Sequence, residues 1–67
     1  FNHSQMIANI MSARMKELGM TQKMLAEKMN CTQQYILKIL KGRENLSLEA
    51  ISKIENALDI HFLQMEE

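Results

Sequence analysis

The segment from Thr21 to Gly42 constrains the fold of this chain more than any other. Its apolar residues recur at helical spacing and predict two short helices, each with one buried side. These residues are Met24, Leu25, Met29, Cys31, Ile36 and Ile39. Thr21 and Thr32 precede the two helices, where a threonine hydroxyl can accept a hydrogen bond from an unpaired amide. Asn30 lies between the helices and tolerates a left-handed backbone. The segment therefore predicts two capped helices joined by a tight turn.

Size and composition favour a single all-α domain. The chain has 67 residues, and we expect residues 1–67 to form one domain with the two-helix motif at about residues 21–42. Apolar residues make up 46% of the sequence but only three are aromatic, so the seven methionines are expected to fill much of the core. Two glycines and no proline provide few of the residues that β-hairpins require. We therefore predict a compact all-α domain of four to five helices.

A longer helix is predicted before the motif. It runs over about residues 4–18 and ends at Gly19, a residue that suits the end of a helix. Its predicted apolar face comprises Ile7, Met11, Met15 and Leu18, with Ile10 beside them. Within the motif, the helices are expected over about residues 22–29 and 33–41, and Gly42 ends the second.

A fourth helix is predicted after the motif. Ser47 is its expected N-terminal cap, and the helix ends at about Leu58. The buried side is expected to comprise Leu48, Ile51, Ile54 and Leu58. Leu46 and Ile51 are spaced for the hydrophobic contact that often brackets a helix start.

The charged residues are unevenly distributed although the net charge is zero. Residues 1–43 carry seven Lys or Arg and two acidic residues, whereas residues 44–67 carry one Lys and six acidic residues. The two parts therefore have charges of about +5 and −5. A basic region around the motif is what binding to phosphate groups requires. We expect the acidic part to face away from a nucleic acid.

The second helix of the motif opens with two glutamines, Gln33 and Gln34. Exposed amides at this place can hydrogen bond to the edges of bases. Two capped helices, a tight turn and these glutamines make a helix-turn-helix pattern, which indicates DNA binding.

The chain resembles the Cro/CI-type (XRE family) helix-turn-helix domain, the fold of lambdoid phage repressors and of many bacterial regulators and antitoxins. The resemblance extends from about Ile7 to Leu63. It is carried by Gly19-Met20-Thr21-Gln22, Leu25-Ala26, Thr32-Gln33-Gln34, Tyr35-Ile36, Lys41-Gly42 and Ala57-Leu58-Asp59-Ile60.

The resemblance implies roles for individual residues. Gln33, Gln34 and Lys38 match base-reading positions of the recognition helix. Five further residues match positions that contact the phosphate backbone in this family, or lie beside such positions. They are Gln22, Thr32, Tyr35, Lys41 and Arg43. For Tyr35 a second interpretation stays open, namely packing beside the start of its helix. Lys38 is compatible with a guanine contact or with a phosphate contact.

The sequence departs from the family pattern at Asn30, which stands where the turn glycine is usual, and also at Met15, Leu40 and Leu37. Met15 and Leu40 stand where the family often has an Arg and a Glu that form an ion pair. Packed apolar residues can replace such a pair at little cost, so we expect the fold to be preserved. Leu37 is predicted to face solvent or DNA, where polar residues are common. Two interpretations stay open for it: contact with a thymine methyl group, or plain exposure.

Other kinds of site lack support in the sequence. His3 and His61 have no companion residues at metal-ligand spacing, and no catalytic set or phosphate-binding glycine loop is visible. We expect neither catalysis nor a metal or cofactor. Cys31 is expected to be a buried thiol, and a single cysteine fits a reducing cytoplasm. No membrane span or signal peptide is visible. The first residue is Phe1 rather than Met, so we expect the sequence to be part of a longer chain.

The expected function is sequence-specific binding of double-stranded DNA by a transcriptional regulator, most often a repressor in this family. Such proteins usually bind as homodimers. The expected dimer contact lies in the C-terminal tail, residues 60–67, at Ile60, Phe62, Leu63 and Met65. Residues 60–67 are predicted to form either a short last helix or a strand that pairs with a second subunit. The alternative function is that of an antitoxin, which binds a toxin protein through its acidic half or tail and autoregulates its operon.

Overall fold

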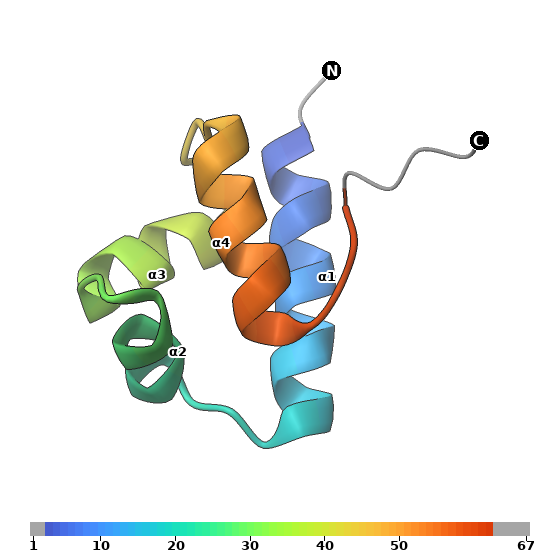
Figure 1. The fold of residues 1–67 in the computed structure, drawn as a ribbon. Coiled ribbons are helices and arrows are strands. Elements are labelled where there is room, and N and C mark those ends of the chain that lie inside the picture. Colours follow the sequence, from blue (N-terminus) through green and yellow to red (C-terminus); the bar gives the residue numbers. More distant parts are fainter. Residues whose placement is uncertain (1–2, 63–67) are drawn as a thin grey trace.

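The described part of the chain folds into helices joined by short loops (Figure 1). The computed structural model describes residues 3–62. Its elements are α1 (His3–Leu18), α2 (Gln22–Met29), α3 (Gln33–Leu40) and α4 (Leu48–Leu58). The predicted all-α fold is confirmed, and the predicted boundaries agree to within one residue. Residues 60–62 are not helical, and most of the predicted terminal helix or strand lies outside the described residues.

Three helices begin with the predicted side-chain caps. The hydroxyl oxygens of Thr21, Thr32 and Ser47 each accept a hydrogen bond from the backbone amide three residues later, at 3.1 Å in all three cases. Each cap pairs an amide that has no partner within its own helix. The starts of α2, α3 and α4 are thus set by local chemistry.

Three helices also end alike, with one residue in the left-handed conformation. These residues are Gly19 (φ 64°), Asn30 (φ 59°) and Asp59 (φ 55°). The next amide then donates to the carbonyl five residues back, which gives Met20–Met15 at 2.9 Å, Cys31–Ala26 at 2.9 Å and Ile60–Glu55 at 3.1 Å. This pattern is the Schellman motif, which satisfies carbonyls left over at a helix end. The predictions for Gly19 and Asn30 are confirmed, whereas the left-handed Asp59 was not anticipated.

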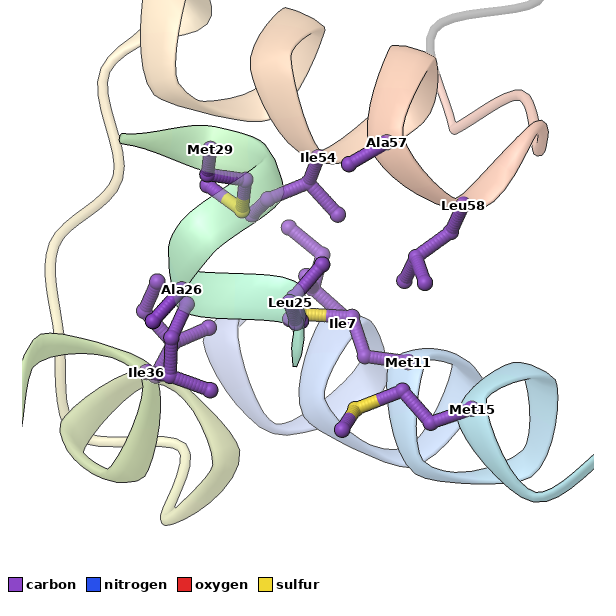
Figure 2. Close-up of a cluster of buried hydrophobic side chains, with 11 residues drawn as sticks. Ile7, Met11, Met15, Leu25, Ala26, Met29, Ile36, Ile54, Ala57 and Leu58 are labelled. Carbon is purple, nitrogen blue, oxygen red and sulfur yellow. The ribbon is translucent and has the colours of Figure 1, made fainter. Parts of the chain in front are cut away.

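Residues from all four helices meet in one apolar core (Figure 2). In Figure 1, α1 and α4 lie side by side while α2 and α3 lie to one side of them, and α2 packs most closely against α3. The core comprises Ile7, Met11, Met15, Leu25, Ala26, Met29, Ile36, Ile39, Ile54, Ala57 and Leu58. Three of its members are methionines, as the composition predicts. Ala26 and Ala57 are small, which allows neighbouring helices to approach closely.

Four residues predicted to be buried are exposed: Ile10, Leu18, Met24 and Leu48, with exposed fractions between 39% and 70%. Leu18 and Leu48 are terminal residues of α1 and α4, where fewer neighbours surround a side chain. Ile10 and Met24 directly precede the buried residues Met11 and Leu25. Because each residue turns the helix by about 100°, their side chains lie on the outer sides of their helices. The predicted apolar faces are therefore wrong at these four positions, whereas the other end of α4 is correct, since Leu58 is completely buried.

The family ion pair is indeed replaced by apolar packing. Met15 is buried with 7% of its surface exposed, and Leu40 packs against the core. Among residues 3–62 no charged or polar residue is buried. The neighbouring Arg14 instead ties α1 to the end of α4, since its Nε donates to the Leu58 carbonyl at 2.8 Å. Its guanidinium also forms an ion pair with Glu17 at 3.1 Å.

Candidate nucleic-acid interface

Helix α3 is held by one side and presents the other to solvent. On the inner side, Ile36 and Ile39 are almost completely buried, with 0% and 1% of their surfaces exposed. The outer side carries the exposed residues Gln33, Gln34, Leu37 and Lys38, followed by Lys41 at the end of the helix. These positions are separated by one, three or four residues, so they form a continuous strip along the helix. We call this strip, from Gln33 to Lys41, the outer face of α3.

The three predicted base-reading residues lie together on this outer face. Gln33 and Gln34 are the first two residues of α3, and Lys38 follows about one turn later. All three side chains are exposed. The structure therefore brings them together on one face of one helix, while their contact with bases stays a prediction.

The Thr32 hydroxyl caps α3 and can in addition donate a hydrogen bond. Its hydroxyl oxygen accepts from the Tyr35 amide at 3.1 Å, and the residue itself is exposed. A threonine hydroxyl that accepts one hydrogen bond can still donate its own hydrogen. The cap is thus compatible with the predicted donation to a phosphate.

The predicted phosphate contacts at the end of α3 gather around one hollow. Lys38, Lys41 and Arg43 line it, together with Glu44. The cationic residues Lys41 and Arg43 are exposed, whereas Glu44 is half-buried. Positive charge therefore continues directly from the outer face of α3 into the loop that follows.

Two contacts with α1 hold this loop in place. The Ser4 hydroxyl donates to the Glu44 carbonyl at 2.8 Å. Gly42 is buried and left-handed (φ 72°), and a side chain added to it would place its Cβ 3.1 Å from the Cα of Gln5. Glycine is needed here both for the backbone conformation and for the close approach of α1. Neither contact was predicted, because the partners are about forty positions apart in the sequence.

Gln22 and Tyr35 are only partly exposed. Gln22 is the first residue of α2, so the structure places it on a different helix from the other candidates. Tyr35 packs against the core, and burial, followed by the charge of Glu44, raises the pKa of its hydroxyl. The hydroxyl therefore keeps its proton at neutral pH. Its donation to a phosphate stays a prediction.

The tail residues expected to form a dimer contact are partly engaged within the chain. Ile60 and Phe62 both pack against the core and are half-buried. The Phe62 amide also donates to the Glu55 carboxylate at 2.6 Å. Leu63 and Met65 lie outside the described residues. The segment that leaves α4 is thus held against its own domain up to Phe62.

Other kinds of functional site find little support within residues 3–62. No three His, Cys, Asp or Glu side chains in this range lie close enough to share a metal ion. Cys31 is half-buried, and burial raises the pKa of its thiol, so it is mostly protonated at neutral pH. None of the described helices combines the length and apolar character of a membrane span.

Comparison with known proteins identifies the motif formed by α2, the turn at Asn30 and α3. A protein-family model described as "Helix-turn-helix" matches residues 10–64. The match includes α2, the turn at Asn30, α3, the following loop and α4, and thus every residue that we single out on the outer face of α3. No curated protein and no solved structure matches the chain.

Proposed function

Because the chain belongs to the XRE-type helix-turn-helix family of DNA-binding transcription regulators, we propose that it binds double-stranded DNA sequence-specifically and represses transcription. One observation supports this most strongly. The inner side of α3 is locked into the core, while its outer face presents two amides and two cations that have no part in the core. Such a face suits the major groove, whose width admits an α-helix.

In the proposed complex, α3 lies in the major groove with its N-terminal end against the bases. Gln33 and Gln34 are long enough to pair their amides with an adenine, which offers an acceptor at N7 and a donor at N6. Lys38 donates to a guanine or to a phosphate. These contacts supply sequence preference, whereas contacts with the phosphate backbone set the position of the helix.

We assign the backbone contacts to residues from both helices of the motif and the loop. They are Gln22, Thr32, Tyr35, Lys41 and Arg43. The loop anchors at Ser4 and Gly42 support this assignment, because a fixed loop loses less conformational entropy when it binds. Exposed cations that neutralise phosphates also make the affinity depend on salt.

We propose that two copies bind together, each on one half-site. A single motif contacts few base pairs, and half-sites about 34 Å apart allow two copies of α3 to lie in successive major grooves. The proposed dimer contact comprises Ile60, Phe62, Leu63 and Met65. A bound dimer would repress transcription by covering promoter DNA. The proposed location of the protein is the cytoplasm.

Selection of bound duplexes from a random DNA library tests the proposal. We expect a two-fold symmetric site with half-sites about one helical turn apart and an A·T pair in each half-site. Sedimentation of the chain with this duplex should show two copies per site. Recovery of unselected sequences with the same affinity as the enriched ones would contradict sequence-specific binding, and one copy per site would contradict the dimer.

The separation of charge favours a second candidate function. Helix α4 and the residue after it carry Glu49, Glu55 and Asp59 but only one cation, Lys53. This acidic element suits a basic protein partner, as expected of an antitoxin that holds its toxin and also represses its own operon. The test is co-purification with the product of the neighbouring gene. Substituting Glu49 and Asp59 with Lys should abolish this association and leave DNA binding intact.

A further inference from the structure

Leu37 is the one apolar side chain on the outer face of α3. It is 40% exposed and does not contribute to the core or to the hydrophobic residues packed against it. Its neighbours one turn earlier on the helix surface are polar, since it follows Gln34 by three residues and Gln33 by four. In the free protein this leucine therefore leaves apolar surface in water, one turn beyond the two glutamines that are proposed to contact bases.

The chemistry of the major groove limits what can cover such a side chain. The edges of adenine, guanine and cytosine present hydrogen-bond donors and acceptors there, whereas thymine also presents its 5-methyl group. A leucine gains nothing from a hydrogen-bonding edge, but it removes apolar surface from water when it packs against a methyl group. The partner that fits Leu37 is a thymine.

We infer that Leu37 is a specificity-determining residue that selects a thymine in each half-site through its 5-methyl group. This inference rests on the proposed function, because it requires α3 to lie in the major groove. The adjacent glutamines agree with it: a glutamine that pairs with adenine is bound to an A·T pair, whose thymine lies in the same groove. Leu37 and a glutamine thus select the same kind of base pair by different contacts.

The test replaces thymine by deoxyuridine, which lacks only the 5-methyl group, at each thymine of a duplex selected from the random library. Loss of one buried methyl contact should weaken binding about fourfold per thymine contacted. We expect this loss at one position of each half-site. Leu37→Ala should still bind the selected duplex but should bind the thymine and deoxyuridine forms equally well.

Leu18→Ala is the matched control, since Leu18 is exposed to a similar extent (44%) but lies on α1. This variant should keep the full preference for thymine. If no duplex is selected, both the proposed function and this inference fail. If a duplex is selected and no thymine position is sensitive, or if Leu37→Ala keeps the wild-type preference, this inference alone is overturned.

Discussion

Gly42 allows a direct test of how the loop after α3 is held. Its backbone is left-handed (φ 72°), and a Cβ at this position would lie 2.5 Å from the side-chain Oε1 of Gln5 and 3.1 Å from its Cα. Gly19 has nearly the same backbone angle (φ 64°), but a Cβ there would meet no atom within 4 Å. The two glycines therefore share the conformational requirement and differ only in the space available to a side chain.

We expect Gly19→Ala to lower the free energy of unfolding by about 1 kcal/mol, the cost of a left-handed alanine less the entropy gained by restricting the unfolded chain. Gly42→Ala should lose the same amount plus the cost of a close contact with the backbone of α1. Overpacking of this kind typically costs about 1–3 kcal/mol, so the total should be about 2–4 kcal/mol. That is a large part of the stability of a small domain.

Urea denaturation followed by circular dichroism measures both losses. A second variant, Gln5→Ala, shortens the side chain that faces Gly42 but keeps the Cα. Combined with Gly42→Ala, it should restore only part of the lost stability. Equal losses for the two glycine variants would refute our account of the contact, and complete restoration by Gln5→Ala would show that the side chain of Gln5, rather than the backbone of α1, limits the space.

Three further predictions concern the motif itself. Thr32→Ala should lower the free energy of unfolding by about 1 kcal/mol, whereas Thr32→Ser should retain most of it, because serine also caps a helix; thermal denaturation compares the two. Lys41→Ala should weaken binding to specific and random duplexes alike and reduce the slope of log affinity against log salt by about one, as measured by fluorescence anisotropy; an unchanged slope would show that Lys41 contacts no phosphate. Folding raises the pKa of Cys31 and Tyr35, so the folded state keeps protons that the unfolded state loses first, and stability should fall as the pH rises above about 9. Cys31→Ala should reduce this fall in a pH series of denaturation curves, and an identical fall would contradict the assignment to Cys31.

The local features of the fold could be predicted from the sequence because each depends on a few neighbouring residues. Thr21 and Thr32 cap helices through amides three residues away, and Asn30 ends α2 through its own backbone angle. The left-handed Asp59 follows the same rule and was missed, although Asp is among the residues that tolerate this conformation.

Burial at the margins of the helices could not be predicted, because it depends on how the helices cross. Met24 and Leu48 are spaced to face the core, yet both are exposed, while Ala57 is buried. The contact from Arg14 to the end of α4 likewise joins residues 44 positions apart. Nothing in the local sequence distinguishes Arg14 from other exposed cations before the fold is known.

The positions of the candidate site residues follow from the start of the helix and from the family resemblance. Gln33 and Gln34 are expected as exposed amides at the start of α3 and Lys38 about one turn later, and all three are exposed there, while their contact with bases stays a prediction. What the sequence did not reveal is the support of the site, namely the close approach of α1 to Gly42 and the bond from Ser4 to the following loop.

The central claim is that the outer face of α3 distinguishes DNA sequences. Its most direct test measures the affinities of Gln33→Ala and Gln34→Ala for the selected duplex and for a random duplex at one salt concentration. We predict that both variants lose affinity for the selected duplex, by about tenfold or more, and keep the wild-type affinity for the random one. Equal changes in affinity for the two duplexes would contradict the assignment of these glutamines as base-reading residues.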